Sequence, residues 1–310
     1  MSAPKGIYMA VKPVDVSIII PCYNGMRTVK ECLNSLLSLD PQSPSHEIIV
    51  VDNGSTDGSV DVITSYKQVK LLFEHNIQGP SAARNTGVRG SHGAILAFID
   101  IDCVVTERWL IESVAAFEDQ SVVGAGGRIE GTVPKNEIQV WMNNAKILDQ
   151  ERTVNHQFMP FLQTANAFFR KEAFMKIEGF DTGLICGEDA DLSWRIQKES
   201  GGRIAYCPKA LVYHDHRASI KGLYRQSRTN AMAGALLSRK WEGALPKKSW
   251  KTSVWEVWDL FLSWLRLIAS YLTFSSKSKR FGLRLDFLHR LGRKDGMIRS
   301  AIKTKQWSQW

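Results

Sequence analysis

The chain has 310 residues, of which 44% are hydrophobic and 23% are charged, and its formal net charge is +9. This composition excludes a disordered or collagen-like chain and is sufficient for a sizeable hydrophobic core. The five cysteines are dispersed without a C-x-x-C pair, which argues against a disulfide scaffold and favours reduced thiols in a reducing compartment.

The first hundred residues alternate between short apolar runs and segments with helical spacing. Strands are predicted at 16–21, 47–52, 70–76 and 94–100, and helices at 28–39, 60–67 and 79–91. This alternation is typical of βαβ units. It predicts an α/β fold with a mostly parallel sheet and helices on both faces.

Polar side chains follow each predicted strand at its carboxyl end. They are Asn24, then Asp52, Ser55 and Asp57, then Asn76 and Arg84, then Asp100 and Asp102. Because the carboxyl ends of parallel strands share one edge of a sheet, these residues are expected to converge on one ligand site. The first strand is followed by neither G-x-G-x-x-G nor G-x-x-x-x-G-K-[ST], so dinucleotide and P-loop sites lack their fingerprints.

The stretch "FIDIDCVV", residues 98–105, ends a buried strand with two carboxylates one residue apart. Burying them unpaired is costly, and like charges repel. Solvated acids at a strand end, or a helix cap, are the simpler explanations, although Thr106 already supplies a better cap. The functional explanation is a pair of oxygen ligands for a hard divalent cation.

Seven segments, in their order and spacing, resemble family 2 glycosyltransferases with the GT-A fold. They are "SIIIPCYNG" (17–25), "EIIVVDNGSTDGS" (47–59), "NIQGPSAARNTG" (76–87), "FIDID" (98–102), "ANAFFRKEAF" (165–174), "GFDTGLICGEDADLSWRI" (179–196) and "GGRIAYCPKALVYHDH" (201–216). The resemblance implies a catalytic domain over residues 1–216, with a nucleotide-sugar half at about 14–103 and an acceptor half at about 104–216. It implies inverting transfer of a sugar from a nucleotide-diphosphate sugar, expected to be a UDP-sugar, to an acceptor hydroxyl in glycan or polysaccharide synthesis.

The same resemblance implies roles for the nucleotide-binding residues. Asp52 would accept from the uracil N3–H, and Arg84 would donate charge-assisted hydrogen bonds to the nucleotide. The other expected nucleotide contacts are Pro21, Tyr23, Asn24, Ser55, Asn76 and Asp100. The structural alternatives are an Asx turn from Asp52 to Gly54 and a surface ion pair for Arg84.

For the metal, the resemblance implies Mn²⁺ or Mg²⁺ that bridges the two phosphates as a Lewis acid. Asp102 is expected to be the direct ligand, with Asp100 on the ribose or the metal. His214 in "LVYHDH" is the expected histidine ligand, and His216 is the second choice. The alternative for His214 is a histidine packed in the core.

Inversion requires a base that takes the proton of the acceptor hydroxyl. By resemblance this is Asp189, with Glu188 as the second choice. Asn166, Asp191 and Trp194 are expected to contact the acceptor or the sugar, and Gln163 is a weaker candidate. Asp191 at a helix start would also suit the helix dipole, and Trp194 is equally compatible with a core position.

The tail differs from the front of the chain in charge. Residues 217–310 contain 20 Lys and Arg against 5 Asp and Glu, a net charge of +15, whereas residues 1–216 contain 20 against 26, a net charge of −6. A helix is predicted over 216–241, near the acceptor entrance. Residues 254–274 predict a second, nearly apolar helix with one polar stripe made of Glu256, Asp259, Ser263, Arg266 and Ser270.

Three charges in this second helix argue against a membrane span and favour a helix lying in an anionic membrane interface. Together with the absence of a secretory signal, this predicts a cytoplasmic enzyme peripheral to the inner face of the membrane, acting on a lipid-linked or other membrane-proximal saccharide. The alternative is burial of this helix against the catalytic domain or against a second copy in a homo-oligomer.

Two other classes compete with the transferase. A nucleotidyltransferase also has an α/β sheet with paired aspartates, but "PCYNGMRTVK" is a poor match to its Gly-rich loop. A nucleic-acid-binding protein would use the basic tail. No recognised nucleic-acid motif is present, so no nucleic-acid partner is expected.

Overall fold

The computed structural model describes residues 14–244, 250–273 and 275–304. The strands of this part are β1 (Val16–Cys22), β2 (His46–Asp52), β3 (Val69–Phe73), β4 (Ile95–Phe98), β5 (Cys103–Val105), β6 (Val122–Gly131), β7 (Ala167–Arg170) and β8 (Arg203–His214). The helices are α1 (Val29–Leu37), α2 (Ser59–Thr64), α3 (Pro80–Arg89), α4 (Trp109–Val114), α5 (Glu137–Asn144), α6 (Gln150–Val154), α7 (Lys171–Lys176), α8 (Glu188–Ser200), α9 (Ile220–Lys240), α10 (Trp250–Leu272) and α11 (Lys277–Thr304). Short 3₁₀ helices occupy Ala115–Glu118 and Thr164–Asn166.

The strands described above form one sheet in the order β3-β2-β1-β4-β7-β6-β8-β5. The four strands predicted from the sequence make its parallel half, because β1 pairs in parallel with both β2 and β4, and β2 with β3. The other half is mixed: β6 and β8 are parallel, whereas β7 and β5 run antiparallel to their neighbours. The predicted α/β architecture with helices flanking a mostly parallel sheet is confirmed.

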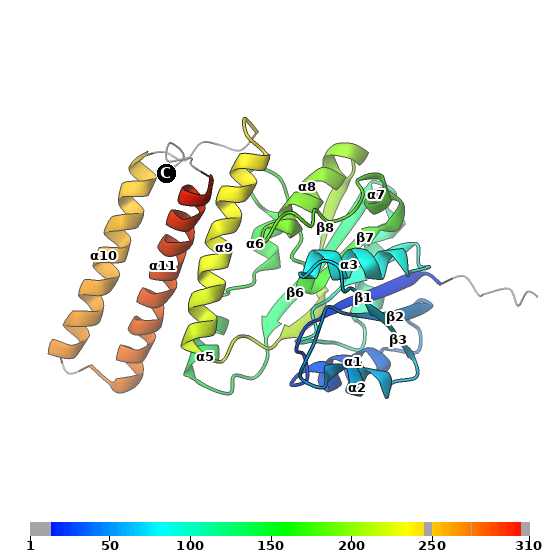
Figure 1. Cartoon of the computed structure of the whole chain (residues 1–310), viewed down its shortest axis with the longest axis horizontal. Coiled ribbons are helices and arrows are strands. Elements are labelled where there is room, and N and C mark those ends of the chain that lie inside the picture. The colour runs from blue at the N-terminus through cyan, green and yellow to red at the C-terminus, as the bar shows by residue number, and fades with distance from the viewer. Residues whose placement is uncertain (1–13, 245–249, 274, 305–310) are drawn as a thin grey trace, which may run out of the picture.

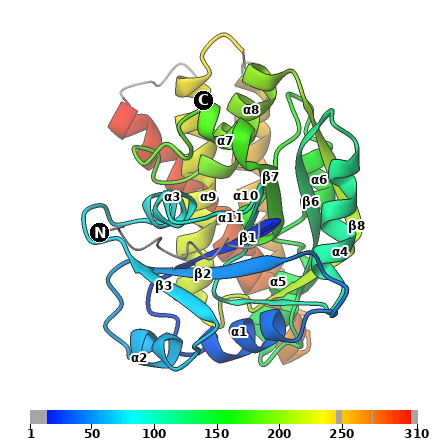
Figure 2. The ribbon, with the colours of Figure 1, turned by 90° about the vertical axis from the view of Figure 1, so that its right-hand side faces the viewer.

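Helices cover both faces of the sheet. Ile18 and Ile20 of β1 point to the face covered by α1 and α4, and Ile19 points to the face covered by α3, α7 and α8. This follows from the two-residue alternation of a strand, and each such buried side chain stabilises the fold by roughly 1.5–3 kcal/mol. Figure 2 shows α3 and the α1–α2 pair on opposite sides of the β1–β3 edge.

The C-terminal helices α9, α10 and α11 stand side by side, with α11 between the other two (Figure 1). Two glycines permit the close approach of α11 to α9, because a Cβ at Gly296 would lie 2.1 Å from the Arg228 carbonyl oxygen and one at Gly292 would lie 2.9 Å from that of Tyr224. Leu223 of α9 and Leu285 of α11 pack with Met142 of α5, which attaches these helices to the sheet domain.

The helices predicted for the tail are present. The first is α9, whose start is capped by Ser219, since its hydroxyl accepts from the Gly222 N–H at 3.1 Å. The second is α10. Within the described ranges, no helix combines the length and apolar character that crossing a membrane requires. The domain boundary near residue 216 stays a prediction.

Candidate active site

The loops after β1 and β2 brace each other at the carboxyl edge of the sheet. Asn24 adopts a left-handed backbone conformation with φ of 52°, and its Oδ1 accepts from the Thr56 N–H at 2.8 Å. The Ser55 hydroxyl accepts from the Asn24 N–H at 2.9 Å. Asn24 and Ser55 therefore shape this edge. Pro21 is half-buried, and the side chain of Tyr23 is exposed.

Asp52 is buried at the end of β2 and makes the turn that was the structural alternative for it. Its carboxylate accepts from the backbone N–H groups of Gly54 at 3.0 Å and Ser55 at 3.1 Å. A carboxylate offers about four lone-pair positions. Asp52 therefore still has acceptor capacity for a nucleobase N–H.

Two residues that the sequence interpretation missed hold the loop after β3. The Asn53 amide donates to the carbonyls of Glu74 at 2.8 Å and Ile77 at 2.9 Å, and its Oδ1 accepts from the Gly79 N–H at 2.6 Å. Glu74 accepts from the N–H of Asn76 at 2.9 Å. Both residues directly follow the end of a strand, and this position was the signal in the sequence that could have identified them. Residues at such positions also form ordinary turns, so the signal is weak. Asn76 itself is exposed at the rim.

Arg84 on α3 connects Asp100 to the acidic start of α8. Its guanidinium is buried and lies 2.8 Å from an Asp100 oxygen and 3.5 Å from a Glu188 oxygen. The Nε and Nη1 atoms of Arg84 are buried without a hydrogen-bond partner in the described part of the chain. The surface-pair alternative for Arg84 is therefore not what the structure shows. A buried cation with donors to spare suits an anionic ligand.

Asp189 lies in the first turn of α8, where its carboxylate is held by Thr164. The Thr164 N–H donates to Oδ2 at 3.2 Å, and the Thr164 hydroxyl donates to Oδ1 at 3.1 Å. Burial raises the pKa of Asp189 to about 7, with the charge of Glu188 adding to the rise and that of Arg84 opposing it. A carboxyl poised near neutral pH is suited to general-base work.

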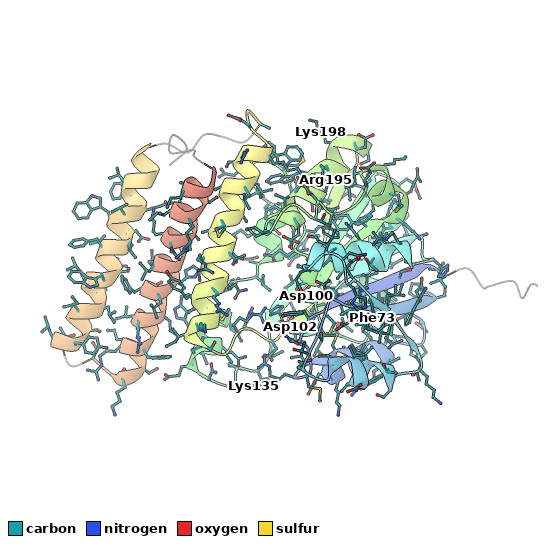
Figure 3. All side chains as sticks on the ribbon, viewed as in Figure 1. Phe73, Asp100, Asp102, Lys135, Arg195 and Lys198 are labelled. Atoms are coloured by element: carbon teal, nitrogen blue, oxygen red, sulfur yellow. The ribbon has the colours of Figure 1, made fainter. Side chains whose placement is uncertain are left out.

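Pairing of β5 with β8 brings Asp102 and His214 together, because Cys103 lies directly opposite His214. The distance from Asp102 Oδ1 to His214 Nε2 is 3.3 Å. Figure 3 labels Asp100 and Asp102 on the side of the sheet that faces α9. Unlike Asp102, Asp100 is turned to Arg84.

The donor set fits a divalent cation. Ligand atoms of Asp102, Cys103 and His214 all lie within 4.8 Å of one another. Burial raises the pKa of the Cys103 thiol well above its ordinary value, and this thiol donates to the Ala165 carbonyl, so it packs as a thiol. Asp102 Oδ1 is buried and accepts no hydrogen bond from the described residues, as expected for an oxygen that faces a shared cation. All five cysteines lie in described ranges as free thiols.

His216 lies beside His214, with 4.9 Å between the ring centroids. Burial lowers the pKa of His216 to about 4, and the neighbouring His214 adds to the decrease. The imidazole of His216 is therefore neutral near pH 7. Its Nδ1 is buried without a hydrogen-bond partner among the described residues.

Two residues expected to contact the acceptor are packed in the interior. Asn166 is fully buried and accepts from the Trp109 indole N–H at 2.9 Å, while its amide donates to the carbonyls of Arg128 and Ala210. Trp194 is 2% exposed and donates its indole N–H to the Met159 carbonyl. In this structure neither side chain is open to a sugar, and Trp194 takes the core position that was its alternative.

Asp191, the third expected acceptor contact, connects α8 to the end of α9. Its side chain is 0% exposed. It accepts from Arg195 Nε at 2.8 Å, Lys240 Nζ at 2.9 Å and the Trp241 indole N–H at 3.1 Å. Lys240 also pairs with Asp181 at 2.5 Å. Asp191 therefore holds α8 and the end of α9 together through buried ion pairs and hydrogen bonds, and its carboxylate is not open to an acceptor. Gln163, the weaker candidate, keeps its Oε1 buried without a partner among the described residues.

Comparison with known proteins agrees with this arrangement. The family model described as Glycosyl transferase family 2 matches residues 17–178. Glycosyltransferase AglE of Haloferax volcanii is 31% identical over 69% of this chain and 71% of its own length. The pre-mycofactocin glycosyltransferase of Mycobacterium tuberculosis is 31% identical over 67% of this chain, which spans only 44% of that longer relative.

Among solved structures, the mannosyltransferase PcManGT from Pyrobaculum calidifontis, in complex with GDP-Man and Mn²⁺, superposes with a TM-score of 0.63 at 18% identity, over 95% of this chain and 90% of that chain. At this identity the likeness establishes the fold alone. The strand-end carboxylates, the acidic start of α8, and the matching family model and relatives lead to one conclusion: this chain is a glycosyltransferase and belongs to glycosyl transferase family 2.

Proposed function

We propose that the chain is a metal-dependent inverting transferase that moves a sugar from a UDP-sugar to an acceptor hydroxyl. The observation that carries the proposal is the juxtaposition of two units, the Asp102–His214 cluster and the Asp189 carboxyl of raised pKa, linked through Arg84 and Asp100. One unit suits the departing diphosphate and the other suits the attacking hydroxyl. An inverting displacement needs both on opposite sides of the anomeric carbon.

Each residue then has a defined task. Asp102 and His214, with Asp100 beside them, would hold Mn²⁺ or Mg²⁺, which supplies positive charge to the diphosphate. Arg84 donates to the nucleotide phosphates or ribose from its buried position. Asp189 takes the acceptor proton, and its hydrogen bonds from Thr164 fix the carboxylate in place. Asp52 reads the base through its remaining acceptor positions.

A thermal-shift screen of nucleotides with Mn²⁺ tests this proposal. We expect UDP to raise the melting temperature by several degrees, because saturation at 100 times Kd stabilises the folded state by about 2.7 kcal/mol. Omission of the metal should reduce the shift. GDP is the matched comparison, since PcManGT was solved with GDP-Man. A larger shift with GDP than with UDP would show that the site binds guanine and not uracil. No shift with any nucleotide would overturn the proposed function.

For the partner surface, we propose that α10 lies on the anionic inner face of the membrane, near a lipid-linked or other membrane-proximal acceptor. The polar stripe of α10 is directed inward to α11: Lys294 pairs with Glu256 at 2.6 Å, and Arg290 pairs with Asp259. Ser263 and Ser270 on the same stripe are buried. The outer face of α10 is therefore apolar, which is the reverse of an ordinary surface helix.

The exposed residues on this face are large. Trp255, Val257 and Leu272 are 71%, 60% and 74% exposed, and Trp258 and Phe261 are also exposed. Contiguous apolar surfaces of this kind mark interaction sites. Residues 217–310 carry a net charge of +15, which favours an anionic lipid surface over a second copy of this chain. Each basic residue near an anionic membrane contributes roughly 1 kcal/mol to binding, whereas two equally basic copies repel each other.

Co-sedimentation with vesicles tests the membrane surface. We expect the wild type to bind vesicles that contain phosphatidylserine, less strongly as salt screens the basic residues. Trp258→Glu with Phe261→Glu should release the protein without changing nucleotide binding. The matched control is Val140→Glu with Met175→Glu, which adds the same charge at two exposed apolar positions away from α10. Dimers in solution without vesicle binding would show that a second copy covers α10.

A further inference from the structure

A cavity lies next to the proposed catalytic site, between strands β6 and β8 and the segment that joins α5 to α6. Its volume is about 330 Å³, at the lower end of the ~300–1,000 Å³ usual for small-molecule sites. The lining includes Arg128, Glu130, Lys146, Glu151, Tyr206 and His216. The nucleotide and base roles described above use none of these side chains.

Two residues in the wall of the cavity connect it to the two reactive units of the site. On one side its wall is His216, whose ring centroid lies 4.9 Å from that of His214. On the other side its wall is Gln150, whose Oε1 accepts from the Gln163 N–H at 2.9 Å. The next residue, Thr164, donates to Asp189. The wall residue Gln150 is thus connected to Asp189 by two hydrogen bonds and one peptide link.

A buried polar atom in the wall has no partner from the described residues. His216 is 4% exposed, and its Nδ1 makes no hydrogen bond. Leaving such a group unsatisfied costs roughly 1–3 kcal/mol. A ligand hydroxyl would satisfy this ring nitrogen, whether the hydroxyl donates or accepts.

The charges of the lining select among ligand classes. Two basic side chains, Arg128 and Lys146, face three acidic ones, Glu130, Asp149 and Glu151. Arg128 and Glu130 already neutralise each other at 3.3 Å. A slight negative excess disfavours a phosphate or carboxylate. Closely spaced donors and acceptors of both signs, together with the ring of Tyr206, suit a molecule that is neutral and rich in hydroxyl groups.

We propose that this cavity binds a neutral saccharide unit of the acceptor and presents its hydroxyl to Asp189. The proposal rests on the proposed transfer reaction and assigns the acceptor class to a site made by β6, β8 and the α5–α6 segment. It replaces the acceptor contacts expected of Asn166 and Trp194, which are packed in the interior. Any diphosphate of a lipid carrier would lie outside the cavity, because its charge does not match the lining.

Saturation-transfer NMR on the full chain, with UDP and Mg²⁺ present, tests the proposal. The probes are the methyl β-glycosides of glucose, galactose, mannose and N-acetylglucosamine, with methyl β-glucuronide as the charged comparison. We expect at least one neutral glycoside to bind and the glucuronide to bind more weakly. In the variant Tyr206→Phe with Glu151→Gln, the dissociation constant of that glycoside should rise about tenfold, because the phenol hydroxyl is removed and a charged acceptor is replaced by a weaker, neutral one.

The matched control is Tyr66→Phe with Glu107→Gln, which removes the same groups near α2 and α4, where Tyr66 donates to Asn34. Both double variants should bind UDP as the wild type does. Failure of every neutral glycoside to bind, preference for the glucuronide, or unchanged binding in the Tyr206 variant would overturn the acceptor site. A wild type that binds neither UDP nor GDP would instead refute the transfer reaction, so the two failures are distinguishable.

Discussion

Replacement of Asp102 by alanine is expected to abolish sugar transfer and to weaken UDP binding. The physical reason is that the diphosphate leaves with two or more negative charges, and Asp102 with His214 would hold the cation that compensates them. Loss even of an outer-shell partner lowers metal affinity about 10–100-fold, so loss of a direct ligand should exceed that. Calorimetry of UDP binding with and without Mn²⁺, beside a transfer assay, measures both effects.

Asp119→Ala is the matched control for this experiment. Asp119 is an exposed aspartate that pairs with Arg203 at 2.7 Å, outside the site, so its loss should leave nucleotide binding unchanged. The metal role of Asp102 would be refuted if the Asp102 variant kept full transfer activity in the presence of EDTA.

The change Asp189→Asn should lower turnover by roughly 10²-fold or more while donor binding survives, because it keeps the shape of the side chain and removes the basicity. In the wild type, activity should fall as the pH drops through about 7, since the carboxyl becomes protonated there. Glu188→Gln is the comparison. Near-normal turnover in Asp189→Asn with loss in Glu188→Gln would transfer the base role to Glu188.

The same carboxyl has a consequence for stability that is independent of activity. Its pKa is raised from 3.8 to about 7, so the folded state disfavours the ionised form, and stability present at low pH is lost as the pH rises through this window. The asparagine variant carries no such charge. Its melting temperature should therefore exceed that of the wild type by more at pH 8 than at pH 4.

Much of the parallel half of the fold was predictable because its signals are local. The run at 16–21 became β1, and the periodicity at 28–39 became α1, since β-branched runs and helical spacing each need only neighbouring residues. The order β4-β7-β6-β8-β5 was not predictable, because antiparallel insertion of β7 depends on pairing between distant segments.

In the site, too, the features with local signals were predictable and those that depend on distant segments were not. Asp102 and His214 are 112 residues apart, and their meeting follows from the β5–β8 register, which resemblance suggested but spacing alone does not contain. Trp194 was equally compatible with a contact to the sugar and with a core position. The spacing of an aromatic residue on a helix does not show whether its ring is buried by other parts of the chain. On α10 the stripe was visible in the sequence, whereas its partner, α11, was not.

The salt bridge between Lys240 and Asp191 ties the far end of α9 to the first turn of α8, two residues from Asp189. A fragment that ended at residue 216 would remove two of the three partners of Asp191, Lys240 and Trp241, together with the cover that they provide. The smallest fragment that keeps all three partners of this carboxylate therefore ends at Trp241. A displacement of the C-terminal end of α9 would therefore act directly on the first turn of α8, which carries the proposed base Asp189.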